Sequence, residues 1–83
     1  MKYLVLTIRR PTFDDAVRPD HYAFLESLRR RAILEQAGPF TDRSGGAYVI
    51  RARNLDEARK IAHEDPLHRH DCSDVTVREW DAR

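Results

Sequence analysis

The chain has 83 residues, a net charge of +1 from 15 basic and 14 acidic side chains, and a hydrophobic fraction of 41%. This length allows one domain over residues 1–83 with a thin core, and the apolar content is that of a folded chain rather than a disordered one. The balanced charge is not that of a nucleic-acid-binding or membrane-surface protein. A single cysteine, Cys72, excludes an internal disulfide and is typical of a reducing compartment.

Two further features bear on location and partners. The N-terminal apolar run, residues 3–8, is too short for a signal peptide or a membrane span, so we expect a cytoplasmic protein. Arginine runs at 9–10 and 29–31 would suit nucleic acid, but the second lies near Glu26 and Glu35 and is typical of a solvated helix face. We therefore expect neither nucleic acid nor a membrane as partner.

The first third of the chain predicts a strand, a loop and a helix. Residues 2–8 are rich in β-forming types and apolar on both faces, which indicates a strand that is covered on both sides. Residues 9–18 lack periodicity and predict a loop. Pro19 suits the first turn of a helix. The inner face of this helix comprises residues at helical spacing: His21, Leu25, Leu28 and Ala32.

Two strands and a turn follow. Residues 33–37 predict the second strand, which Gly38-Pro39 would end, and residues 47–52 predict the third. The polar segment 41–46 lies between them and closes on two glycines. These features predict a hairpin whose turn lies at the end of the sheet.

The last third predicts a helix and a strand. Asn54, with Glu57 three residues later, resembles a capping box, and Pro66 would end the helix. Its inner face comprises Ala58, Ile61, Ala62 and Asp65. Residues 75–80 predict the fourth strand. The order βαββαβ predicts an α+β, ferredoxin-like fold, in which a four-stranded antiparallel sheet carries both helices on one face.

This topology gathers unusual residues at one end of the sheet. The start of the first helix, the end of the second strand, the following turn and the end of the second helix all meet there. The residues at these places are His21, Gly38, Pro39, Ser44, Gly45, Gly46, Asp65 and Pro66. We therefore expect the functional site at this end.

His21 and Asp65 are the polar members of two otherwise apolar helix faces. Burial beside a helix N-terminus favours the neutral imidazole, which can act as a base. A helix C-terminus disfavours a carboxylate, so Asp65 needs a donor, which the ring N–H of His21 would supply. Two interpretations stay open: a base oriented by a carboxylate, or a histidine bonded to the backbone and an aspartate that caps the turn before Pro66.

Other candidates have a structural alternative as well. Gly38 and the pair at 45–46 would allow close approach of a ligand, but a plain turn also requires glycine. Tyr22 and Tyr48 could line a pocket or pack in the core. Residues 63–72 are rich in histidine and end in Asp71 and Cys72, but their spacing matches no zinc site. We interpret that segment as a solvated loop and expect no metal and no cofactor.

Six motifs in order, nearly end to end, resemble the YCII-related (YciI-like) family. They are Arg18-Pro19-x-His21, Ala37-Gly38-Pro39, Gly45-Gly46, Leu55-Asp56-Glu57-Ala58-Arg59, Asp65-Pro66 and Val75-x-Val77-Arg78-x-Trp80. The resemblance implies a ferredoxin-like dimeric α/β barrel with a His–Asp pair as the proposed active site, here His21 and Asp65. Ser44 stands where relatives place a small polar residue. Ala32 departs from the family pattern, because relatives commonly have a glycine there, and residues 71–74 are more polar than usual.

Two classes of function follow. The first is a small enzyme that transfers protons on a small metabolite, with a lyase or isomerase outcome. His21 would be the base, Arg18 would hold an anionic group, and main-chain N–H groups around Gly38 and residues 44–46 would stabilise developing negative charge. The second is a non-catalytic module that binds a small molecule or a partner protein.

The apolar first strand also predicts assembly. Helices can cover only one face of a four-stranded sheet, so we expect a homodimer whose sheets pack face to face, with Tyr3, Val5 or their strand neighbours at the seam. The alternative is a monomer in which residues 9–18 fold over that face.

Overall fold

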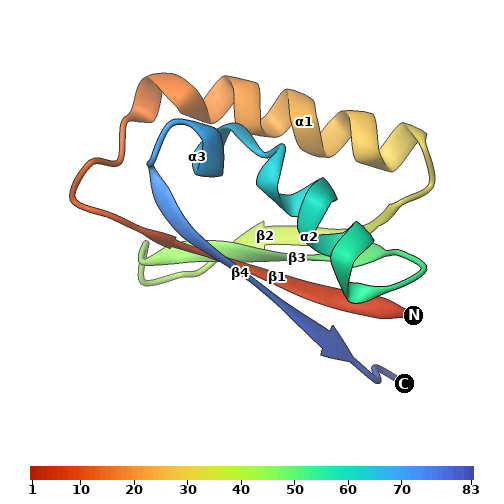
Figure 1. Cartoon of the computed structure of the whole chain (residues 1–83). Coiled ribbons are helices and arrows are strands. Elements are labelled where there is room, and N and C mark those ends of the chain that lie inside the picture. The colour runs from red at the N-terminus through yellow and green to blue at the C-terminus, as the bar shows by residue number, and fades with distance from the viewer.

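Four strands form one antiparallel sheet in the order β2-β3-β1-β4 in the computed structural model, which describes residues 1–83 (Figure 1). The strands are β1 (Lys2–Arg9), β2 (Leu34–Pro39), β3 (Gly45–Arg51) and β4 (Ser73–Trp80). The earliest strand is thus central and pairs with β3 on one side and β4 on the other. This is the ferredoxin-like α+β arrangement predicted from the order of elements.

The helices lie together on one face of that sheet (Figure 1). They are the short 3-10 helix η1 (Asp15–Val17), α1 (Arg18–Arg30), α2 (Leu55–His63) and α3 (Pro66–Arg69). The predicted cap of α2 is confirmed, because the Asn54 side chain accepts a hydrogen bond from the Glu57 N–H at 2.8 Å. None of the helices combines the length and apolarity needed to span a membrane.

Nine buried side chains between the helices and the sheet form the core. They are Tyr3, Val5, Leu25, Leu28, Leu34, Tyr48, Ile50, Ala58 and Ala62. Tyr3 and Val5 of β1 face this core, so placing these two residues at a dimer seam is wrong. Strand alternation turns their neighbours Leu4, Leu6 and Ile8 to the opposite face, which no helix covers. Residues 10–17 do not cover it either, because this connection rises toward α1 at the left end of Figure 1.

The end of α1 differs from the prediction. Ala32 lies beyond the helix, in the left-handed region with φ of 59°, and not on the inner face. The N–H groups of Ala32 and Ile33 donate to the carbonyls of Arg29 at 3.0 Å and Leu28 at 2.9 Å. This is a Schellman motif, whose left-handed position favours glycine. The family's usual glycine therefore has a clear backbone role, and alanine fills that position here.

The β2–β3 hairpin is longer than predicted. β2 does not stop before Gly38 but continues to Pro39, and these two residues pair with Ala47 and Gly46 of β3. Proline is tolerated because β2 lies at the edge of the sheet, where one side of the strand has no partner. On the other strand Gly45 has φ of +154°, and a Cβ there would lie 1.8 Å from the Thr7 carbonyl oxygen. Close backbone packing therefore requires this glycine.

The segment after α2 is ordered and partly buried, so its interpretation as a solvated loop is wrong. Pro66 begins α3 instead of only ending α2, and the N–H of Cys72 donates to the Leu67 carbonyl at 2.9 Å. Both Leu67 and Cys72 are buried. The side chains of His63 and His68 stack at 4.2 Å, and no group of three or more potential ligands gathers around a metal position.

Candidate active site

A cleft of about 340 Å³ opens at the end of the fold where the sequence placed the site. The end of β1, the start of α1, the β2–β3 turn and α3 meet there, at the left of Figure 1. The cleft is lined by Thr7, Arg9, Phe13, Arg18, His21, Tyr22, Leu25, Glu26, Arg29, Ala37, Gly38, Pro39, Gly45, Gly46, Ala47, Tyr48, Leu67 and Ser73. Its walls thus combine aromatic surface, glycine-rich backbone and three arginines.

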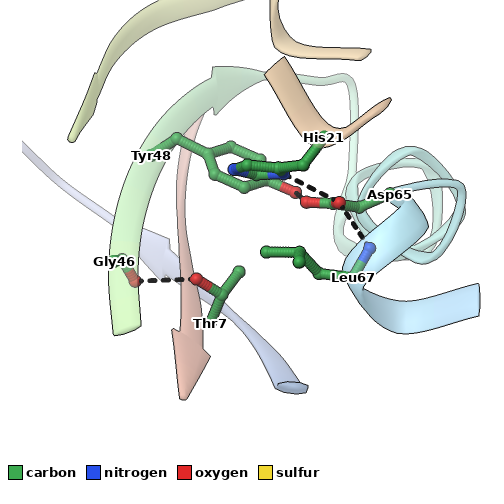
Figure 2. A network of polar contacts seen from close by, with 6 residues as sticks. All are labelled: Thr7, His21, Gly46, Tyr48, Asp65 and Leu67. Atoms are coloured by element: carbon green, nitrogen blue, oxygen red, sulfur yellow. Dashed lines mark hydrogen bonds and ion pairs between the residues drawn. The ribbon is translucent and has the colours of Figure 1, made fainter. Parts of the chain in front are cut away.

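His21 and Asp65 lie in contact at this end. His21 Nδ1 is 2.9 Å from Asp65 Oδ1, and the two residues come from α1 and from the start of α3 (Figure 2). The side chain of His21 is 13% exposed and lines the cleft, whereas Asp65 is fully buried behind it. A neutral ring that donates from Nδ1 to the carboxylate keeps a lone pair on Nε2. In this tautomer the Nε2 lone pair is free to accept a proton.

Asp65 accepts two hydrogen bonds besides that of His21. The Leu67 N–H donates to Oδ1 at 2.9 Å, and the Tyr48 hydroxyl donates to Oδ2 at 3.0 Å (Figure 2). The prediction that Asp65 ends helix two is wrong, because α2 ends at His63 and Asp65 is the N-cap of α3. A capping carboxylate is favoured at a helix start, so the buried charge is stabilised by local backbone as well as by side chains.

Tyr48 is the third member of this network, and sequence reasoning left its role open. Its ring centroid lies 6.3 Å from that of His21, and its side chain lines the cleft. Burial, and then the charge of Asp65, raise the pKa of Tyr48 well above its usual value. Tyr48 therefore stays protonated and acts as a donor to Asp65. Its inward position on β3 was the available signal, since a buried tyrosine hydroxyl needs a partner.

Three arginines line the cleft, and only Arg18 was predicted. Arg18 Nη2 lies 2.6 Å from Asp15 Oδ1, and Arg29 Nε lies 3.7 Å from Glu26 Oε2. Arg9 makes no ion pair, and its guanidinium carbon lies 4.2 Å from the centre of the Phe13 ring. Its place could have been found by extending the inward alternation of β1 by two residues beyond Thr7.

Only some of the predicted turn residues line the cleft. Gly38, Pro39, Gly45 and Gly46 line the cleft, but Ser44 does not. The Ser44 N–H donates to Asp42 Oδ1 at 2.9 Å, so it is already engaged within the turn. A Cβ on Gly46 would lie 2.7 Å from the Gly38 carbonyl oxygen, whereas one on Gly38 would meet nothing within 4 Å. Close backbone packing thus explains Gly46 but not Gly38.

Two hydroxyl side chains in the cleft wall were missed. Thr7 Oγ1 donates to the Gly46 carbonyl at 3.2 Å (Figure 2). Ser73, at the start of β4, is 4% exposed, and its Oγ has no hydrogen-bond partner. A buried hydroxyl without a partner is unusual in folded proteins.

Comparison with known proteins concerns the family and the fold of the whole chain. The chain is 45% identical over 78 residues to the uncharacterized protein YjpA of Bacillus subtilis (strain 168), which covers 94% of this chain and 92% of that protein. A solved structure of 5-chloro-2-hydroxyhydroquinone dehydrochlorinase (TftG) from Burkholderia phenoliruptrix AC1100, in complex with 2,5-dihydroxybenzoquinone, is similar, with a TM-score of 0.75 and 22% identity. That similarity covers 98% of this chain and 94% of the other.

A crystal structure of an antibiotic biosynthesis monooxygenase is similar as well, with a TM-score of 0.61 and 16% identity over 99% of this chain and 97% of that one. At these identities the two solved structures support the fold alone. Residues 1–81 match the YCII-related domain. The chain therefore belongs to the YCII-related family.

Proposed function

We propose that this protein is a small-molecule enzyme in which His21 acts as general base and acid, oriented by Asp65, in a lyase or isomerase reaction. The observation that carries the proposal is the buried Asp65 carboxylate, which accepts hydrogen bonds from His21, Tyr48 and Leu67 beside the cleft. In such an arrangement the hydrogen bond to the carboxylate holds the imidazole ring in one orientation while its other nitrogen gains and loses a proton.

The proposed chemistry is proton transfer through the Nε2 atom of His21. In the first step this nitrogen removes a proton from an acidic C–H or O–H group, and the Asp65 charge stabilises the imidazolium that forms. In a lyase the electron pair left on the substrate would expel a leaving group. In an isomerase the imidazolium would return the proton to another atom. Either outcome balances without an oxidant or reductant.

The solved dehydrochlorinase suggests which molecules to try first. Its name describes loss of hydrogen and chlorine from a hydroxylated ring, and its bound molecule is 2,5-dihydroxybenzoquinone. Loss of hydrogen chloride requires a base for the proton, which is the role proposed for His21. The apolar and aromatic part of the cleft wall, including Phe13, Tyr22 and Leu25, would suit a single oxygenated ring.

The test is a screen of small oxygenated aromatic compounds, beginning with 2,5-dihydroxybenzoquinone as a binding probe, followed by activity measurements on those that bind. His21→Ala should abolish turnover of any substrate found. Asp65→Asn should retain binding but lower kcat by roughly 10²–10⁴-fold, because orientation and charge are lost while shape is kept.

His63→Ala is the matched control, because His63 stacks on His68 outside the cleft, and this variant should keep the parent activity. If His21→Ala and Asp65→Asn both bind and turn over substrate like the parent, the pair is structural. A non-catalytic binding module is the second candidate, favoured by the cap that Asp65 supplies to α3. Compounds that bind without any turnover would support it.

We also propose that the protein is a homodimer. The helix-free face of the sheet carries an apolar strip, Leu4, Leu6 and Ile8 of β1. If two copies of the chain pack these faces together, each strip covers the other. This keeps the predicted face-to-face arrangement and replaces the seam residues.

A further inference from the structure

We propose that Arg9 and Ser73 form a carboxylate-binding subsite in the cleft, so that its ligand is an aromatic or similarly sized monocarboxylate. This inference rests on the proposed function, because it names the kind of ligand that the same cleft would hold. It assigns a role to two residues that the His21–Asp65 network does not use.

The first observation is the hydroxyl of Ser73. Its Oγ is buried and has no hydrogen-bond partner within the protein, although the residue is 4% exposed and lines the cleft. Leaving a buried hydroxyl unpaired costs roughly 1–3 kcal/mol. A ligand oxygen in the cleft would accept its proton and remove that cost.

The second observation is the free charge of Arg9. Arg18 and Arg29 also line the cleft, but each has a carboxylate partner, Asp15 at 2.6 Å and Glu26 at 3.7 Å. Arg9 has none, and its stacking on Phe13 at 4.2 Å holds the guanidinium in the cleft wall. An arginine held by an aromatic ring keeps its five donors available for an anion.

The third observation is the position of these two residues in the sheet. Arg9 of β1 and Ser73 of β4 are directly paired in the antiparallel register. Side chains at paired positions lie on the same face, with Cβ atoms about 5 Å apart. This face is the helix side, because Arg9 is two residues beyond the buried Thr7. The two groups can therefore contact one anionic group together.

The balance of charge favours a carboxylate. One guanidinium without a partner and one hydroxyl match a planar group with a single negative charge and two oxygens. A phosphate dianion carries a second negative charge and would need a second free cation, whereas Arg18 and Arg29 are already paired with Asp15 and Glu26. The shared chemistry is thus a monoanion on a small, mainly apolar body.

A pair of probes that differ only in the carboxylate tests this inference. Binding of 3,4-dihydroxybenzoate and of catechol would be measured by isothermal titration calorimetry at fixed ionic strength. In the wild-type protein 3,4-dihydroxybenzoate should bind about 10- to 100-fold more tightly, the gain of a charge-assisted hydrogen-bonded pair. Arg9→Gln should reduce this ratio to below about threefold, and Ser73→Ala should reduce it by about three- to tenfold.

Arg10→Gln is the matched control, because it removes the same charge from the next residue, which pairs with Asp71 and Asp74 and does not line the cleft. Its ratio should equal that of the wild type. Arg9→Lys, which keeps the charge and loses the planar fork, should give an intermediate ratio and guards against a folding defect in Arg9→Gln.

Three results would overturn the inference: equal binding of both probes to the wild type, no binding of either, or an equal loss in Arg9→Gln and Arg10→Gln. An unchanged ratio in Ser73→Ala would remove the serine from the subsite and so contradict the proposal as stated. The proposed function fails separately. His21→Asn should keep the wild-type ratio of 3,4-dihydroxybenzoate binding to catechol binding. If that ratio is as expected but the protein turns over no substrate, the carboxylate subsite stands and the proposed enzyme is rejected.

Discussion

At the scale of single residues, Asp65 is the centre of the polar network beside the cleft. It is fully buried, and its two oxygens accept from three donors that come from α1, β3 and its own backbone turn. The Tyr48 hydroxyl is the donor that can be removed without changing the cleft's shape. It is also a titratable group, so its contribution can be measured through pH.

We expect Tyr48→Phe to lower the free energy of unfolding near neutral pH by about 1–2 kcal/mol, because it leaves Asp65 Oδ2 without its donor. Tyr22→Phe is the control, since Tyr22 is 55% exposed and its hydroxyl bonds to nothing in the protein. It should change stability by less than about 0.5 kcal/mol. Urea unfolding of both variants is the measurement, and equal effects would contradict the role of Tyr48.

The raised pKa of Tyr48 also predicts that the folded protein loses stability at alkaline pH. Its pKa is raised in the folded protein, so the folded state holds the proton more tightly than the unfolded chain does. The corresponding stability is fully present below pH 10, the usual pKa of tyrosine, and declines as pH rises above it. Tyr48→Phe should therefore lose stability less steeply above pH 10 than the parent. Tyr3, whose pKa is also raised, is the same in both proteins and does not affect the comparison.

At the scale of elements, the path of the chain after α1 and after α3 depends on how these helices end. Two of the three α-helices are followed by a residue with positive φ, Ala32 after α1 and Asp71 after α3. In both cases the next residue donates to the first carbonyl of the last turn, from Ile33 to Leu28 and from Cys72 to Leu67. These motifs turn the chain sharply back toward the sheet, and the second one leads directly to Ser73 in the cleft wall.

The Ala32 position gives a test with opposite signs at two sites. Ala32→Gly should raise the free energy of unfolding by about 0.5–1 kcal/mol, because glycine adopts the left-handed conformation without a Cβ penalty. Ala23→Gly, at an exposed position inside α1, should lower it by about 1 kcal/mol. Thermal or urea unfolding measures both. A destabilised Ala32→Gly variant would contradict the conformation described here.

At the scale of the whole molecule, the two faces of the sheet are unequal. The three α-helices cover one face (Figure 1), while strand alternation places Leu4, Leu6 and Ile8 of β1 on the other. Trp80 joins this strip, because it pairs with Lys2 in the register of β1 and β4. Ile8 is 41% exposed and Trp80 is 45% exposed, which is unusual for large apolar side chains on a neighbouring pair of strands.

We expect light scattering at micromolar concentration to give the mass of a dimer. Leu6→Lys, which places a charge in the middle of the open face, should shift the protein toward the monomer. Ala23→Lys, on the exposed side of α1 in the other layer, is the control and should leave the mass unchanged. A monomer mass for the parent protein would reject the dimer.

The sequence by itself determined the order of the elements, the apolar faces of the two longer helices and the end of the sheet where the candidate site lies. The helical spacing of residues 21–28 and the β-forming residues at 2–8 are patterns within fewer than ten consecutive residues, so they can be identified locally. The ferredoxin-like order then brings His21 and Asp65 to the same end, although 44 positions separate them. The fold and the approximate position of the candidate site could therefore be predicted from the sequence.

Only the tertiary structure decided how each side chain is used. The register determines that Tyr3 and Val5, and not Leu4 and Leu6, face the helices, and a shift of one residue would exchange the two sets. The bond from Tyr48 to Asp65 and the pairing of Arg9 with Ser73 join residues from different elements, which no local pattern reveals. Asp65 was predicted at the end of one helix, but the structure shows it as the cap of the next, where it accepts the Leu67 N–H. The donors from His21 and Tyr48, which come from other elements, converge on the same carboxylate.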